Sequence, residues 1–99
     1  MKSIVLIHSI VAAAKGQVSC DLVDEMAILD HKSGIYYGLN EVAGQIWHLI
    51  QEPKAVHEIR DILLEAYEVD AERCEQELII LLQALATYGL IDVESGNAR

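Results

Sequence analysis

The sequence predicts a single α+β domain in which strands come first and helices follow. Two short runs of β-forming residues, Met26–Asp30 and Ile35–Leu39, are joined by a polar turn that contains glycine, which is the pattern of a β-hairpin. After them, apolar residues recur at three-and-four spacing, which is the pattern of amphipathic helices. With 99 residues, of which 53% are hydrophobic, the chain can form one domain with its own core.

One more strand is expected before the hairpin. The segment Gln17–Leu22 alternates between apolar and polar residues, and the turn Val23–Glu25 leads from it into Met26–Asp30. We therefore predict a meander of three antiparallel strands. Its last strand, Ile35–Leu39, comes directly before a helix, so its odd-numbered side chains should face inward and Tyr36 outward.

Three helices are expected after the sheet, at Glu41–Ile50, Ala55–Tyr67 and Ala71–Tyr88. Asn40 and Asp70 are suited to cap the first and the third of them, because their side chains accept hydrogen bonds from the first free N–H groups. Gly89 is placed to end the third helix in a left-handed conformation. A three-stranded antiparallel sheet followed by three helices predicts a winged-helix-turn-helix-like domain.

The two ends of the chain are expected to lie outside this unit. We predict a domain at residues 17–93, a flexible tail at 94–99, and an N-terminal arm or extra strand at 1–16. The run Ile4–Val11 with the following alanines imitates a secretory signal, but His8 and Ser9 interrupt it, so we favour the arm or strand and a cytoplasmic location. No apolar run approaches the roughly 20 residues that span a bilayer.

Composition and motifs argue against several kinds of function. The net charge of -9 disfavours nucleic acid as a partner. The four histidines and two cysteines form no zinc-ligand spacing, and no phosphate-binding or nucleophile motif is present, so we predict no metal, no cofactor and no catalytic residue. Cys20 and Cys74 are read as reduced core thiols. A binding module is the better prediction, and the outer edge of Ile35–Leu39 is its expected site.

The order of motifs resembles PqqD-like proteins, and more narrowly the stand-alone PqqD-family recognition proteins of lasso peptide biosynthesis. The resemblance spans about Gln17 to Val93 and rests on four motifs: Ala27–Trp47, Ala66–Asp70, Arg73–Leu78 and Leu85–Ile91. Two positions depart from the family pattern. Glu77 stands where Asp is expected, and Lys54-Ala55 replaces the Ser or Thr that usually caps the second helix.

The resemblance implies a non-catalytic adaptor that recognises the leader segment of a ribosomally made precursor peptide. The leader would add as an antiparallel strand to Ile35–Leu39, beside the third helix, and be delivered to a transglutaminase-like leader peptidase and indirectly to an ATP-dependent cyclase. The expected peptide-binding residues are Ile35, Tyr36, Tyr37, Gly38, Leu39, Asp70, Arg73, Glu77, Leu78, Ile80 and Leu81.

The expected peptide-binding residues differ in the role that their chemistry suits. An open strand edge provides main-chain hydrogen bonds, so specificity must come from pockets. We expect aromatic walls from the two tyrosines, an apolar floor from Leu78, Ile80 and Leu81, and acidic partners for a basic leader residue in Asp70 and Glu77. Tyr37 and Leu78 are chiefly core residues in this interpretation, and the Asp70 carboxylate also serves the helix cap.

Three alternatives remain open at this point. The fold also suits a winged-helix DNA-binding regulator, although Arg73 is the only cation in the third helix. A small hydrolase or thiol enzyme using Cys74 or Cys20 is a further alternative. An open edge or the apolar N-terminal arm could also pair two copies into a homodimer.

Overall fold

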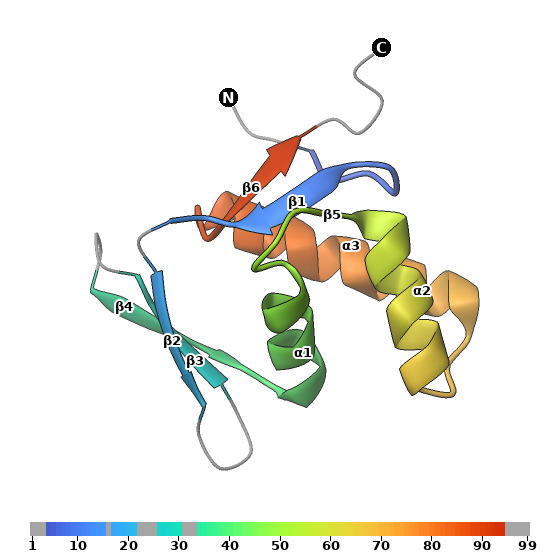
Figure 1. The fold of residues 1–99 in the computed structure, drawn as a ribbon, viewed down its shortest axis with the longest axis horizontal. Helices are drawn as coiled ribbons and strands as arrows, with labels where there is room; N and C mark the ends of the chain where they lie inside the picture. The colour runs from blue at the N-terminus through green and yellow to red at the C-terminus, as the bar shows by residue number, and fades with distance from the viewer. Residues whose placement is uncertain (1–3, 16, 22–25, 31–33, 95–99) are drawn as a thin grey trace.

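The computed structural model describes residues 4–15, 17–21, 26–30 and 34–94. These form two small antiparallel sheets and three helices (Figure 1), in the order β1 (Ile10–Ala13), β2 (Gln17–Asp21), β3 (Met26–Asp30), β4 (Ile35–Leu39), α1 (Glu41–Leu49), β5 (Lys54–Ala55), α2 (Val56–Ala66), α3 (Ala71–Thr87) and β6 (Ile91–Glu94). The predicted α+β class, with a three-stranded sheet followed by three helices, is confirmed.

The first of the two sheets is the expected meander, with strand order β2-β3-β4. Its register places Ile28 opposite Tyr37 and Met26 opposite Leu39. Gly34, directly before β4, has a φ of 72°, a left-handed conformation that glycine adopts without steric cost. The turns expected at Val23–Glu25 and within His31–Ser33 lie outside the described residues.

Local signals in the sequence fix the ends of α1 and α3. The Asn40 Oδ1 atom accepts a hydrogen bond from the Ala43 N–H at 2.9 Å, and the Asp70 Oδ2 atom accepts one from the Arg73 N–H at 3.0 Å. Gly89 has a φ of 76° and lets the Leu90 N–H donate to the Leu85 carbonyl at 2.9 Å, which closes the last turn of α3. Both predicted N-caps and the glycine C-cap are therefore confirmed.

The second sheet, with strand order β5-β1-β6, was not predicted. β1 lies at its centre and pairs with the two-residue strand β5 on one side and with β6 on the other. Ile10 lies opposite both Ala55 and Glu94. Glu94, which was expected in the tail, therefore belongs to a strand, and residues 95–99 lie outside the described part of the chain.

Of the segment expected as an arm or strand at residues 1–16, residues 10–13 form β1, and residues 4–9 lie before it. From here on, the name N-terminal arm refers to residues 4–9, which bind both α2 and α3. The Ser9 carbonyl accepts a hydrogen bond from the Val56 N–H at 2.9 Å, and the Ile7 carbonyl accepts one from the His57 N–H at 3.0 Å. The arm thus supplies main-chain acceptors to a helix whose N-cap, Ala55, has no side-chain acceptor. On its other side, the Val5 N–H donates to the Gln83 side chain of α3 at 2.9 Å.

The core lies between the helices and one face of each sheet. Its fully buried side chains come from every layer: Val11, Ile28, Ile46, Ile50, Val56, Ile59, Leu82 and Leu90. On β4, Leu39 is buried and Tyr37 packs against the core, as predicted. Ile35 was expected to face inward as well but is 50% exposed, because it lies at the hairpin end of β4, whereas α1 follows the other end. Among the described residues, no helix combines the length and the apolar character needed to cross a membrane.

Candidate functional site

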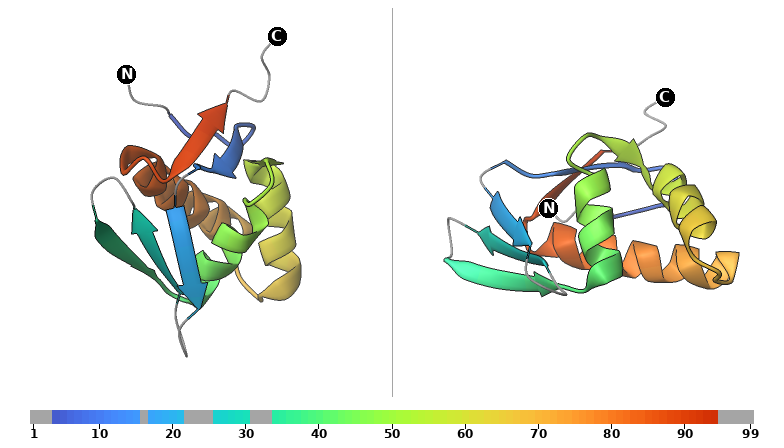
Figure 2. Two further views of the ribbon diagram at one scale, coloured as in Figure 1. Left: turned by 60° about the vertical axis from the view of Figure 1, so that its left-hand side comes forward. Right: turned by 60° about the horizontal axis from the view of Figure 1, so that its bottom comes forward.

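β4 is the last strand of its sheet in the described part of the chain, since only β3 pairs with it. The N-terminal arm does not approach this edge, because its hydrogen bonds go to α2 and α3 and β1 belongs to the other sheet. Figures 1 and 2 show β4 on the side of the molecule away from β1 and β6. The edge can therefore accept a further strand.

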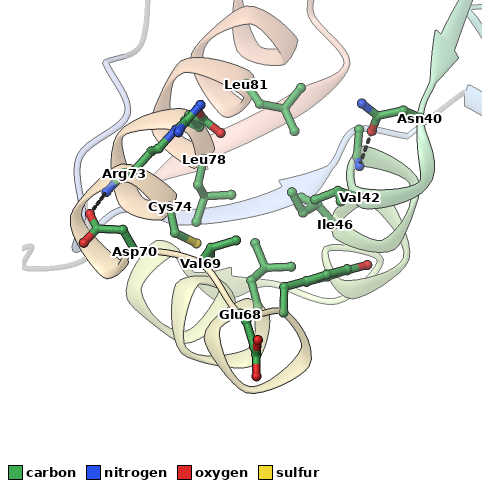
Figure 3. Close-up of a pocket in the computed structure, with 14 residues that line it drawn as sticks. Asn40, Val42, Ile46, Glu68, Val69, Asp70, Arg73, Cys74, Leu78 and Leu81 are labelled. Atoms are coloured by element: carbon green, nitrogen blue, oxygen red, sulfur yellow. Dashed lines mark hydrogen bonds and ion pairs between the residues drawn. The ribbon is translucent and has the colours of Figure 1, made fainter.

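A cavity of about 680 Å³ opens next to the end of β4, between α1, α3 and the segment that joins α2 to α3 (Figure 3). We call it the α1–α3 cavity. It is lined by Asn40, Val42, Ala43, Ile46, Leu63, Tyr67, Glu68, Val69, Asp70, Arg73, Cys74, Glu77, Leu78 and Leu81. Because Asn40 directly follows β4, a peptide on that strand edge can extend into the cavity.

The floor of the α1–α3 cavity is apolar. Leu78 and Ile46 are buried at its base, while Val42 on α1 is 39% exposed and Val69 lies exposed at the mouth. In Figure 3, Val42 and Asn40 project from the α1 side and face Leu78 and Leu81 of α3. Exposed aliphatic side chains around a concave surface gain free energy when an apolar ligand covers them, at about 25 cal/mol per Å². The cavity is therefore suited to an apolar side chain.

Charged side chains line one side of this apolar floor. The Arg73 Nε atom donates to the Glu77 Oε2 atom at 2.9 Å, and this hydrogen bond is the main cause of the raised pKa of Arg73. The Asp70 carboxylate accepts from the Arg73 backbone as the helix cap. Glu68, also at the cavity, has no ion-pair partner among the described residues. Of the three carboxylates, Glu68 is thus the one available to a cationic ligand group.

The structure brings most of the predicted helical site residues together and separates one. Asp70, Arg73, Glu77, Leu78 and Leu81 all line the α1–α3 cavity. Ile80 does not share their floor: it is 68% exposed and lines a different hollow on α3. Its neighbour Leu81 points one helical step of about 100° away, which places the two side chains on different faces.

The predicted residues of β4 follow the strand edge. Tyr37 is half-buried, and its ring lies 5.2 Å from the ring of Tyr88, so β4 is held against the C-terminal end of α3. Gly38 is exposed and leaves the backbone accessible, whereas Leu39 is buried. Tyr36 lies within β4, but its side chain is outside the described part of the structure.

Several lining residues were not predicted as site residues. Val42, Tyr67 and Val69 entered the sequence analysis only as members of a predicted helix or of a family motif. The Tyr67 hydroxyl donates to the Gln45 Oε1 atom at 2.7 Å and so joins α1 to the segment that precedes α3. An apolar residue in the first turn of α1, next to a strand edge, is the sequence signal that could have identified Val42.

Cys74 was read as a core thiol, but it is half-buried and lines the cavity. Burial raises the pKa of its thiol, and the nearby Glu77 carboxylate raises it further. A raised pKa leaves less thiolate at a given pH, and the thiolate is the reactive species.

We therefore predict that Cys74 reacts more slowly with iodoacetamide at pH 7.5 in the folded protein than in urea. Peptide-resolved mass spectrometry measures this site separately from Cys20. Faster alkylation of Cys74 in the folded protein would contradict the prediction and would favour the alternative that the protein is a thiol enzyme.

The described residues give little support to metal binding or to DNA binding by α3. No three histidine, cysteine, aspartate or glutamate side chains gather there in a group that could hold a metal ion. Arg73 is the one cation of α3, and its guanidinium is paired with Glu77. A helix that reads DNA needs several free donors for phosphates and bases, so the DNA-binding alternative lacks its main requirement on this helix.

The described residues thus form an antiparallel sheet whose last strand, β4, lies next to an apolar cavity along the third helix, which is an arrangement suited to holding an extended peptide. The chain belongs to the PqqD family: the family model, described as coenzyme PQQ synthesis protein D, matches residues 25–91. The resemblance noted from the sequence motifs is thereby confirmed.

A solved structure of TbiB1 in complex with the TbiA(beta) leader peptide is also similar to this chain. The two are 34% identical and superpose with a TM-score of 0.76, over 82% of this chain and 94% of TbiB1. No curated protein matches the sequence.

Proposed function

We propose that this protein is a non-catalytic adaptor that binds the leader segment of a ribosomally made precursor, of the lasso peptide class, by strand addition to β4. The observation that carries the proposal is the position of β4, which ends its sheet beside the α1–α3 cavity. It is supported by the similarity to TbiB1, whose solved structure contains a leader peptide. The bound precursor would be presented to a transglutaminase-like leader peptidase and then to an ATP-dependent cyclase, in the cytoplasm.

The two parts of the site have different roles: the edge of β4 provides affinity, and the α1–α3 cavity provides specificity. Main-chain hydrogen bonds to β4 contribute about 1 kcal/mol each and do not depend on the guest's sequence. The α1–α3 cavity selects for an apolar or aromatic side chain, and a basic residue beside it would pair with Glu68 rather than with the occupied Glu77. Such a guest also complements the net charge of -9.

Hydrogen–deuterium exchange with and without a bound leader tests strand addition directly. The probe is a synthetic TbiA(beta) leader, the peptide present in the similar solved structure. We expect those amides of residues 36–39 that point away from β3 to gain protection when the peptide binds, because a new neighbour would accept their hydrogen bonds, whereas the alternate amides already bind β3.

The other sheet is the internal control for this measurement. The amides that join β1 to β6 are already hydrogen-bonded, so their exchange should not change. Protection that appears at β6 rather than at β4 would reject the proposed site, and the absence of TbiA(beta) leader binding in fluorescence polarisation would reject the function.

A further inference from the structure

The segment that joins α2 to α3 forms one wall of the α1–α3 cavity and is held at both of its ends. At one end, the Tyr67 hydroxyl donates to the Gln45 Oε1 atom of α1 at 2.7 Å. At the other end, the Asp70 carboxylate accepts from the backbone of α3 as its helix cap. Glu68 and Val69 lie between these two attachments, along the edge of the cavity (Figure 3). We call residues 67–70 the α2–α3 strap.

The two middle residues of the strap are not fixed by contacts of their own. Neither Glu68 nor Val69 has a hydrogen bond or an ion pair in the described part of the chain. Both are exposed, although both line the cavity. Tyr67 and Asp70 have extended backbone conformations, so neither helix includes them. The position of Glu68 and Val69 therefore depends on how the ends of the strap are attached.

Tyr67 is suited to be the fixed end of the strap. Its ring packs against the core and lines the cavity, and its N–H donates to the Leu63 carbonyl of α2 at 2.9 Å. Its hydroxyl reaches α1, where Gln45 lies three residues after Val42 and hence on the same side of the helix. The hydrogen bond thus ties the strap to the helix that carries the opposite wall of the cavity.

We propose that Tyr67 is a positioning residue of the leader site, an inference that rests on the proposed function. Its hydrogen bond to Gln45 holds Glu68 and Val69 in the conformation that a bound leader contacts. A wall that is already ordered in the free protein lowers the entropic cost of binding. Without the hydroxyl, the strap would keep its attachment to α3 but lose the one to α1, so the leader would have to order it.

Substitutions at both ends of the hydrogen bond test this role. Tyr67→Phe removes the hydroxyl and keeps the ring, while Gln45→Met removes the acceptor and keeps a side chain of similar length. Gln45→Glu retains an oxygen that accepts from the Tyr67 hydroxyl, so it is the conservative variant that should restore wild-type behaviour. Gln76→Met is the matched control, because Gln76 is exposed on α3 and does not line the cavity.

The first measurement is the Kd of the TbiA(beta) leader by fluorescence polarisation. We expect Tyr67→Phe and Gln45→Met each to raise the Kd about fivefold, the equivalent of one net hydrogen bond, and the double variant to raise it no further. Gln45→Glu and Gln76→Met should keep the Kd within about twofold. A merely structural role would lower the free energy of unfolding in urea and leave the Kd of the folded protein unchanged.

The second measurement needs no leader. The backbone ¹⁵N order parameters of residues 68 and 69 in the free protein should fall from about 0.85, typical of a rigid backbone, to below about 0.6 in Tyr67→Phe but not in Gln45→Glu.

Other results overturn the inference. If the wild type binds the leader and both single variants bind it equally well, Tyr67 does not position the site. Unchanged order parameters in Tyr67→Phe would show that its hydroxyl does not hold the strap. A wild-type protein that binds no leader would reject the proposed function itself, and with it the role of Tyr67 in leader binding, whatever the order parameters show.

Discussion

Replacing Leu81 by aspartate is expected to weaken leader binding at least roughly 30-fold, or about 2 kcal/mol. Leu81 is half-buried and lines the α1–α3 cavity, where an apolar guest side chain would exclude water. A carboxylate at this position would lose its hydration on binding without gaining a partner, and the nearby Glu77 would repel it. Fluorescence polarisation with a labelled leader measures the change.

Two further variants test whether the loss of affinity is specific to the α1–α3 cavity. Ile80→Asp carries the same new charge one residue away but outside the cavity, so its leader affinity should remain close to that of the wild type. Val42→Asp lies across the cavity on α1 at a more exposed position and should also weaken binding, with less risk to the fold. Equal affinities for the Leu81 and Ile80 variants, with intact circular dichroism spectra, would exclude the cavity as a leader site.

Replacing Val5 by aspartate is expected to lower the free energy of unfolding by about 3–4 kcal/mol, because the carboxylate would be buried without a partner. Val5 is only 2% exposed and belongs to the core, while its N–H binds Gln83 of α3. Against a typical total of roughly 5–15 kcal/mol, this is a large fraction of the stability. Urea denaturation followed by the fluorescence of the buried Trp47 measures it.

The residue next to Val5 provides the control. Ile4 is 71% exposed, so Ile4→Asp should change the stability by no more than about 0.5 kcal/mol. If both substitutions have the same small effect, the N-terminal arm is not docked in solution as the structure has it.

Features encoded by neighbouring residues were predictable from the sequence. The caps at Asn40 and Asp70 and the glycine at residue 89 act within one helical turn, so their residue types are sufficient to place the ends of the helices. The β2–β3–β4 meander also joins strands that follow one another along the chain. The predicted site residues Asp70, Arg73, Glu77, Leu78 and Leu81 come from α3 and its N-cap, so the sequence was sufficient to group them, and their role in binding stays a prediction.

Features that join distant residues were not predictable in this way. The β5-β1-β6 sheet pairs segments from both ends of the chain, and β5 has only two residues, too few for a periodic pattern. The arm's carbonyl groups cap α2 without any side-chain signal. A helical wheel separates Ile80 from Leu81, but which of the two lines the cavity depends on how α3 is rotated against α1.

Glu94, which ends β6 opposite Ile10, bears on how this domain can be joined to another protein. β6 lies with β1 on one face of the molecule, and β4 lies on a different side (Figure 1). A partner fused after β6 would therefore start away from β4, and a linker of moderate length would leave the peptide groove unobstructed. Covalent fusion to a processing enzyme would then raise the enzyme's effective concentration near the guest without competing for its site.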